Sequence, residues 1–146
     1  MKSTRVTVAS TRSVLIDPNA NLELVKGACR VAAGDGARML FLPELMLTGH
    51  GGHPKMAENA EPVPSGPLCR AIIELSKEHQ LCICVGMAEL SDYTVYNSQI
   101  VVDRGEYLGL QRRYKLYREE YCYSGAGETV EVFDIGDVRF GITICY

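Results

Sequence analysis

Residues 39–44 read Met39-Leu40-Phe41-Leu42-Pro43-Glu44, an apolar run that a proline stops and an acidic residue follows at once. Such a run without alternation is typical of a short strand that is covered on both faces. We expect the strand to end before the proline, which has no N–H for a sheet ladder. The carboxylate of Glu44 then stands just beyond the strand, at the edge where open α/β sheets hold their catalytic groups.

Upstream of this run the sequence predicts one strand and one helix. Residues 5–10 predict the strand. The helix follows, with Asn19 or Asn21 as its N-cap, and Gly34 and Gly36 end it. Its apolar positions keep helical spacing, and they are Leu22, Val25, Cys29 and Ala32.

Downstream of the run, a long loop leads into a second helix and a second buried strand. Residues 48–67 are rich in glycine and proline, and loops of this length in compact domains are usually functional. Ser65 is placed to cap a helix that has His79 near its end, with an inward face of Leu68, Ile72 and Leu75. Residues 81–87 form another apolar run and predict a strand.

Two hairpins complete the predicted fold. One joins residues 100–102 to residues 107–110, and the other joins residues 131–134 to residues 138–144. The final strand alternates, with one buried face formed by Val138, Phe140, Ile142 and Ile144. The order β-α-β-α-β followed by further strands predicts an α/β fold, with a mixed sheet and two helices on one face.

Composition predicts one soluble domain. The chain has 146 residues, is 47% hydrophobic and 23% charged, and carries a net charge of −3, which argues against nucleic acid or an anionic membrane as the main partner. No apolar run approaches a membrane span, and the first residues lack the apolar core of a signal peptide. Cys29, Cys82 and Cys84 fall on apolar faces. We therefore expect buried free thiols in a cytoplasmic protein.

Three residues with reactive side chains follow predicted strands. Glu44, Lys115 and Cys145 come after residues 39–42, 107–110 and 138–144, respectively. If these strands run parallel in one sheet, the three side chains converge on one edge. A carboxylate can take the proton of a thiol, and an ammonium can stabilise the anion formed when a thiolate attacks a carbonyl or nitrile carbon. Together they predict nucleophilic catalysis by cysteine.

The words around these residues resemble the nitrilase superfamily of carbon–nitrogen hydrolases. They are Phe41-Leu42-Pro43-Glu44-Leu45-Met46-Leu47-Thr48-Gly49, Arg112-Arg113-Tyr114-Lys115 and Gly141-Ile142-Thr143-Ile144-Cys145-Tyr146. Supporting words occur in the same order as in the family at residues 86–89, 96–98 and 132–134. The resemblance covers the whole chain and implies the N-terminal part of a four-layer αββα sandwich.

The resemblance also implies a Glu-Lys-Cys triad. Cys145 would attack the C–N carbon, while Lys115 and the backbone N–H of Tyr146 hold the oxyanion. Glu44 would move the protons. A second glutamate of the family matches Glu120, with neighbouring Glu119 as the alternative. The implied substrate is a small amide, carbamoyl compound or nitrile, with no metal or organic cofactor, and transfer of the acyl group to an acceptor other than water stays open.

The sequence departs from the family pattern in four places. His50 stands where many members have tyrosine, Leu116-Tyr117 follows the lysine, and Ala126-Gly127 replaces a Pro-Gly pair. The fourth departure is that the chain ends one residue after Cys145, so we expect residues 1–146 to be a truncated carbon–nitrogen hydrolase domain. An apolar sheet face would then be uncovered, which favours homo-oligomers. The alternative function is a catalytically inactive fragment or partner-binding half-domain.

Other motifs have simpler interpretations. His50 and His53 lack the third ligand that a metal site needs, so a loop beside a substrate pocket is the better account. Cys82-x-Cys84 places both thiols on one face of a strand, unlike a redox turn, so core packing is expected. Four tyrosines could stack on bases, but the acidic surroundings favour a pocket wall; they are Tyr114, Tyr117, Tyr121 and Tyr123.

Overall fold

The computed structural model describes residues 3–50 and 54–145. Within these residues a five-stranded sheet has the order β1-β2-β3-β4-β5, with parallel pairing from β1 to β3 and antiparallel pairing from β3 to β5. The strands are β1 (Val6–Val8), β2 (Met39–Phe41), β3 (Cys82–Ser91), β4 (Thr94–Asp103) and β5 (Glu106–Arg112). Since two reversals separate β5 from β3, β2 and β5 run in the same direction.

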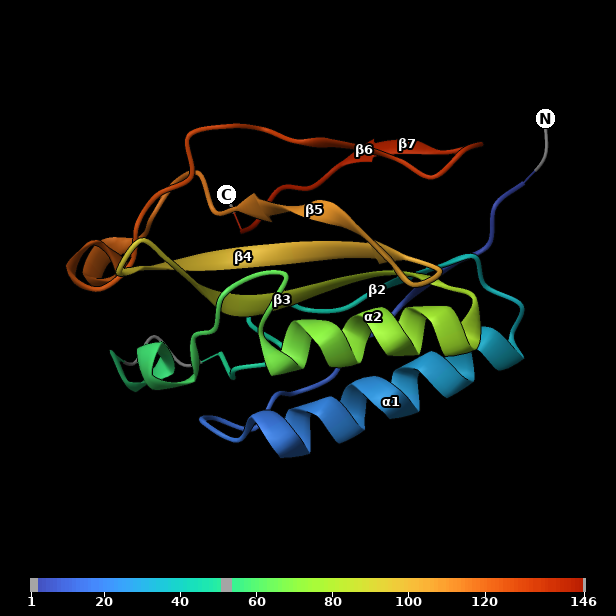
Figure 1. Ribbon diagram of the computed structural model, residues 1–146, viewed down its shortest axis with the longest axis horizontal. Coiled ribbons are helices and arrows are strands. Elements are labelled where there is room, and N and C mark those ends of the chain that lie inside the picture. Colours follow the sequence, from blue (N-terminus) through green and yellow to red (C-terminus); the bar gives the residue numbers. More distant parts are fainter. Residues whose placement is uncertain (1–2, 51–53, 146) are drawn as a thin grey trace.

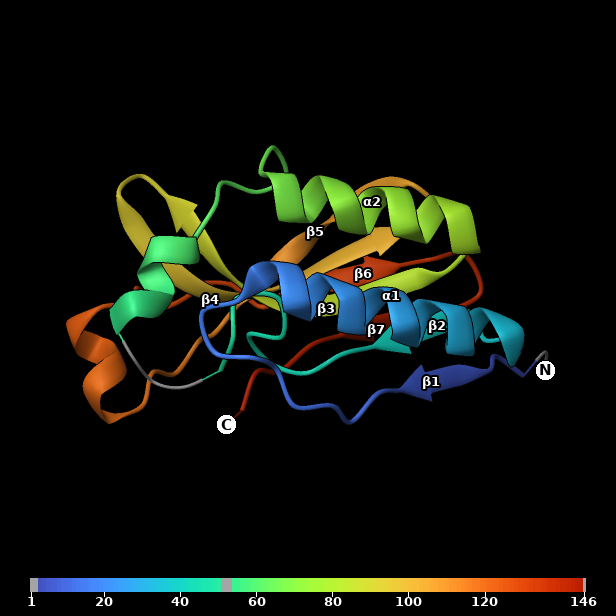
Figure 2. The same cartoon turned by 90° about the horizontal axis from the view of Figure 1, so that it is seen from below.

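The sheet lies between two helices and a small second sheet (Figure 1). Helices α1 (Pro18–Gly34) and α2 (Pro67–His79) cover one face, and Figure 2 shows them side by side across it. The hairpin of β6 (Val132–Asp134) and β7 (Arg139–Gly141) lies over the other face. The predicted α/β fold, with a mixed sheet and two helices on one face, is confirmed.

The predicted cap of α1 is wrong. Asp17 is the N-cap, and its carboxylate accepts a hydrogen bond from Ala20 N at 3.0 Å, while Pro18 opens the helix. Asn21 is instead fully buried, where its side chain binds both backbone groups of Val14 and donates to Leu47 O at 3.3 Å. The asparagine therefore ties the segment before α1 to the segment after β2.

The predicted cap of α2 is also wrong, because a residue from the long loop supplies it. Gly66 occupies the N-cap position and offers no side chain. The carboxylate of Glu61, only 8% exposed, accepts hydrogen bonds from Leu68 N at 3.0 Å and Cys69 N at 2.8 Å. Glu61 also exchanges backbone hydrogen bonds with the end of β3, so it joins the loop, the helix and the sheet. The loop also contains a short 3-10 helix, η1 (Pro54–Asn59).

Both predicted hairpins are present, but strand lengths differ. β4 begins at Thr94 and pairs with β3 through a tight turn at Asp92 and Tyr93, a hairpin that the sequence did not predict. β7 ends at Gly141 rather than at Ile144, because its partner there is Val132, the residue at which β6 begins. The predicted alternation still holds, since Ile144 is buried and Ile142 packs on the core of this layer.

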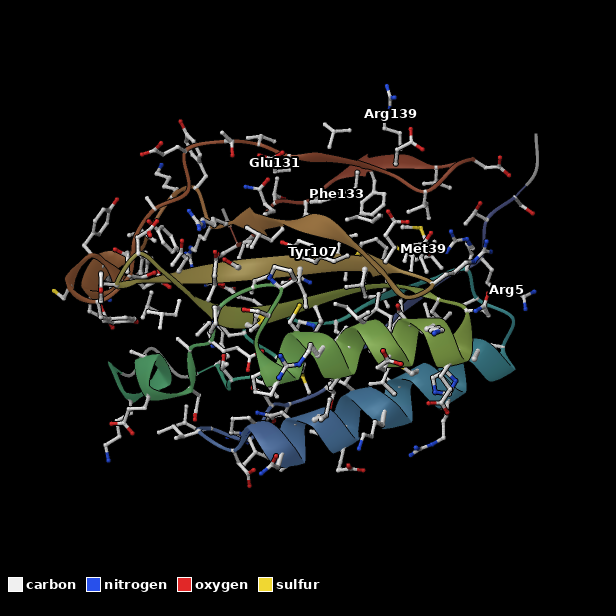
Figure 3. The ribbon with its side chains drawn as sticks, in the orientation of Figure 1. Arg5, Met39, Tyr107, Glu131, Phe133 and Arg139 are labelled. Carbon is white, nitrogen blue, oxygen red and sulfur yellow. The ribbon has the colours of Figure 1, made fainter. Side chains whose placement is uncertain are left out.

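The expectation of an uncovered sheet face is wrong for much of that face. Met39, Cys82, Cys84 and Val101 point away from the helices and are at most 2% exposed. The β6–β7 hairpin buries them, and Figure 3 shows Phe133 directed from the hairpin toward the sheet while Arg139 points outward. In the part of the chain that the structure describes, no helix combines the length and apolar character needed to cross a membrane.

We predict that Glu61→Ala lowers the free energy of unfolding by about 1–3 kcal/mol, because two buried N–H groups lose their acceptor. Urea denaturation followed by circular dichroism measures this change. Glu58→Ala, which removes an exposed carboxylate three residues earlier, is the matched control and should be close to neutral. Equal midpoints for the two variants would contradict the capping role.

Candidate active site

The segment after β2 lies directly against β3, and this contact places Glu44. Leu42 N donates to Cys84 O, Gly86 N donates to Pro43 O, and Leu47 N donates to Gly86 O. The close approach requires glycine at position 86, because an added Cβ would lie 2.3 Å from Leu45 N. Beyond it, Ala88 N donates to the buried hydroxyl of Thr48 at 3.1 Å. The carboxylate of Glu44 is therefore presented from a fixed turn.

The two oxygens of the Glu44 carboxylate have different surroundings. Oε1 accepts a hydrogen bond from Asn97 Nδ2 at 2.6 Å and another from Arg113 Nη1 at 2.8 Å. Oε2 lies 3.7 Å from His50 Nε2. The side chain of Glu44 is 20% exposed. One oxygen is thus held by two donors, and the other is available to exchange a proton.

Arg113 links Glu44 to the second glutamate. Its Nη1 also lies 3.0 Å from Glu120 Oε1, and its Nε donates to Lys115 O at 2.9 Å. Glu120 belongs to the 3-10 helix η2 (Arg118–Cys122), which it caps by accepting from Tyr117 N at 2.7 Å. Glu119, the alternative second glutamate, is exposed. Glu44 and Glu120 are therefore brought together through one guanidinium.

Cys145 lies in the same region, although it follows a strand of the other sheet. It lines a cavity of about 330 Å³ whose other lining residues are His50, Arg113, Tyr117, Glu119, Glu120 and Tyr123. The expectation that all three candidates follow parallel strands of one sheet is therefore wrong, because β7 pairs only with β6 among the described strands. Cys145 is exposed and has a φ of 59°, and Leu45, next to Glu44, has a φ of 50°. Cys145 and the residue after Glu44 thus both adopt a left-handed backbone conformation, which residues other than glycine seldom adopt.

Lys115 lies apart from these groups. Its side chain is exposed and lines a second cavity, of about 270 Å³, together with Ile142, Thr143 and Ile144. This places it beside the residues that lead to Cys145. Lys115 and Glu44 share the expected edge, because β5 and β2 run in the same direction. Tyr146, the predicted backbone donor, lies outside the described residues.

The other thiols have different environments. Cys29 and Cys69 are fully buried, and burial raises the pKa of Cys29 to about 11 and that of Cys69 to about 12. Cys82 and Cys84 are fully buried in the layer under the β6–β7 hairpin, as their sequence pattern predicted. Cys122 on η2 is exposed, as Cys145 is, so these two are the accessible thiols among the described residues.

The structure also bears on the metal hypothesis. Among residues 3–50 and 54–145, no three His, Cys, Asp or Glu side chains gather in a way that could hold a metal ion. His50 instead faces Glu44, and its backbone N donates to Ser13 Oγ at 3.1 Å. His53 lies outside the described residues.

Two polar residues around Glu44 were missed by sequence analysis. Asn97 is 5% exposed and Arg113 is 3% exposed, so both are buried polar groups whose partner is the candidate base. A backbone hydrogen bond from Arg113 N to Asn97 O, of 2.8 Å, holds them side by side. A signal was available for Asn97, which interrupts a buried strand with an amide. No comparable signal was available for Arg113, because it follows another arginine and nothing in the sequence distinguishes the two.

Comparison with known proteins now defines the family. The carbon-nitrogen hydrolase family model matches residues 5–146. The chain belongs to the carbon–nitrogen hydrolase family. A nitrilase from Pyrococcus abyssi is 27% identical over 135 residues, which are 90% of this chain and 52% of that protein. A glutamine-dependent NAD(+) synthetase from Thermotoga maritima is 31% identical in an alignment that is 149 residues long with its gaps and covers 99% of this chain and 26% of the synthetase.

A solved structure gives the same fold for this carbon–nitrogen hydrolase chain. The crystal structure of an amidase from Nesterenkonia sp. superposes with a TM-score of 0.85 at 20% identity, over 98% of this chain and 56% of the amidase. The chain therefore spans between a quarter and a little over half of these proteins. The nitrilase-like fold expected from the sequence is confirmed.

We predict that Gly86→Ala disturbs this hydrolase chain strongly, since the new methyl group would meet backbone rather than a movable side chain. We expect a loss of about 1–3 kcal/mol or more in the free energy of unfolding. The control is Gly34→Ala at the end of α1, where an added Cβ meets nothing within 4 Å. Thermal melts of both variants test this, and an undisturbed Gly86→Ala protein would contradict the placement of Glu44 by close packing.

Proposed function

We propose that this chain carries the reacting groups of a carbon–nitrogen hydrolase, with Cys145 as nucleophile, Glu44 as general base and acid, and Lys115 as the cation that stabilises the oxyanion. The observation that carries the proposal is the joining of three segments around one cavity. Cys145 and Glu120 line it, and Arg113, also in its wall, connects Glu120 to Glu44. Family membership supports the same assignment.

The chemistry follows from the geometry of Glu44. Its Oε2 accepts the proton of the Cys145 thiol, and the sulfur bonds to the carbon of the C–N group. When the C–N bond of an amide breaks, the same oxygen returns the proton to the leaving nitrogen. A nitrile first gives a thioimidate, which adds one water before ammonia leaves and the thioester forms. Water then attacks the thioester and gives a proton to Glu44. The C–S bond breaks, the acid leaves, and the thiol regains its proton. Each proton that Glu44 accepts is passed on, so the cycle balances.

The cation completes the site by stabilising charge on the substrate. Attack by sulfur places a negative charge on the carbonyl oxygen or nitrile nitrogen, and a nearby ammonium lowers the energy of that state. Lys115 follows β5 at the same sheet edge as Glu44, and it lies beside residues 142–144, immediately before the nucleophile. The backbone N–H of Tyr146 is the second proposed donor.

The cavity favours a small substrate. A volume of about 330 Å³ is at the low end of small-molecule sites, and Tyr117 and Tyr123 give it partly apolar walls. The relatives are a nitrilase, a glutamine-dependent synthetase and an amidase. We therefore propose a small amide or nitrile as substrate, with no cofactor. Transfer to an acceptor other than water would use the same thioester.

The first test compares two accessible thiols in the same protein. We predict that iodoacetamide at pH 7 alkylates Cys145 at least tenfold faster than Cys122, because Glu44 assists the loss of its proton. Peptide mass spectrometry measures both rates. Glu44→Gln should slow Cys145 and leave Cys122 unchanged, and Cys145→Ala should abolish release of ammonia from short aliphatic amides. Equal rates at the two thiols in the unmodified chain would refute the proposed nucleophile and favour a non-catalytic, partner-binding role.

We also propose that the protein forms homo-oligomers. β1 is an edge strand of the described sheet, and its Val6 and Val8 are 45% and 76% exposed. Unpaired edges with apolar side chains favour association. We predict that Val8→Lys shifts the protein toward monomer in sedimentation velocity, with Thr7→Lys on the opposite face of the strand as the control. A monomeric unmodified chain would contradict this proposal.

A further inference from the structure

We propose that Arg113 is a positioning residue of this site, one that supplies the cation between Glu44 and Glu120 and holds the two carboxylates in a fixed relative place. Its consequence for turnover rests on the proposed function, because it assumes that Glu44 moves the proton of Cys145. The underlying effect on Glu44 does not depend on that assumption.

The contacts of Arg113 join three separate segments of the chain. Nη1 is shared between Glu44 Oε1 at 2.8 Å, after β2, and Glu120 Oε1 at 3.0 Å, in η2. Nε donates to Lys115 O at 2.9 Å, just beyond β5. The side chain is only 4% exposed. A buried guanidinium with fixed donors in several directions sets the relative positions of its acceptors.

The balance of charge around Glu44 depends on this one guanidinium. The carboxylates of Glu44 and Glu120 bind the same nitrogen, so they are close neighbours of like charge. His50 faces the other oxygen of Glu44 at 3.7 Å but is 56% exposed, and Glu119, which lines the same cavity as Glu120, is also exposed. Without Arg113, two carboxylates would share a partly buried site without the cation that both now bind, and each would disfavour the charge on the other.

Loss of the Arg113 cation should also change how activity depends on pH. A protonated Glu44 cannot accept the proton of Cys145. Removing the cation makes the ionised form appear only at higher pH, so the acidic limb of the activity profile moves upward. The loss would be largest at low pH and would be recovered in part as pH rises. A residue with only a structural role would instead lower activity by the same factor across the profile.

The neighbouring arginine provides a matched control. Arg112 makes a bidentate ion pair with the buried Glu89, at 2.9 Å from Nε and 2.6 Å from Nη2. It lies next to Arg113 in sequence and also pairs with a buried carboxylate, but within the described residues its ion pair goes to Glu89 rather than to Glu44 or Glu120, and it does not line the Cys145 cavity. Arg112→Met should therefore reduce stability without changing how Glu44 titrates.

The direct test follows the Glu44 carboxyl by NMR in the full chain labelled with carbon-13 at the glutamate carboxyl carbon, with Glu44→Gln to assign the signal. In Arg113→Met the titration of Glu44 or Glu120 should move upward, because the cation that binds both carboxylates is gone. In Arg112→Met the titration of Glu44 should stay at its wild-type position. Wild-type titration of both carboxyls in Arg113→Met would overturn the proposal, whether or not the chain turns over substrate.

A second variant tests geometry where the first tests charge. Arg113→Lys keeps the cation but cannot reach all three acceptors, so we expect the Glu44 signal to change less than in Arg113→Met while Cys145 alkylation falls at least threefold relative to Cys122. Unchanged alkylation of Cys145 together with an unchanged Glu44 signal in Arg113→Lys would overturn the positioning role. This test remains decisive even if Arg113→Met fails to fold. Failure of Cys145 to outpace Cys122 in the unmodified protein would count against the proposed function alone.

Discussion

The close packing of the segment after β2 on β3 is the contact on which the site depends. Gly86 has no side chain, and this allows Pro43 and Leu45 to lie directly on the strand. Hydrogen bonds that join residues 42–48 to β3 extend the same contact. Asn21 then joins Leu47 to the start of α1. A helix, a loop and two strands are therefore fixed to one another at the place where Glu44 emerges.

The polar residues around Glu44 compensate for the loss of hydration that this packing causes. A carboxylate held close to a buried sheet loses much of its hydration, and desolvation disfavours its charge unless donors replace the water. Asn97 and Arg113 supply those donors to a single oxygen, and they come from β4 and from the end of β5. The remaining oxygen lies 3.7 Å from Nε2 of His50, whose side chain is 56% exposed. The fold thus holds the carboxylate through one oxygen and places the other near His50.

The sequence predicted the fold class and most elements because their signals are local. The apolar run at residues 39–42, the helical spacing from Leu22 to Ala32 and the turn at 103–105 each depend on residues close in sequence. The caps were wrong for opposite reasons. Asp17 lay just outside the expected window, whereas Glu61 reaches α2 from a loop that has no local pattern to indicate it.

The candidate site shows the same limit. Glu44, Lys115 and Cys145 could be singled out from motifs, but the sequence could not show that β7 pairs outside the main sheet or that Lys115 lines a separate cavity. Arg113 was hidden for a physical reason. Its importance comes from contacts with Glu44 and Glu120, 69 and seven residues away. Such distant pairings are set by tertiary packing and leave no periodic trace.

The left-handed turns at Leu45 and Cys145 limit which residues evolution can place there. Each costs about 1–2 kcal/mol for a residue with a β-carbon, and the cost is larger for β-branched side chains. Leu45 is also 3% exposed, so glycine would relax the turn but leave a void. Valine, isoleucine and threonine fit the space poorly in this conformation. The position beside Glu44 is therefore restricted by backbone shape, independently of any chemistry proposed for the neighbouring carboxylate.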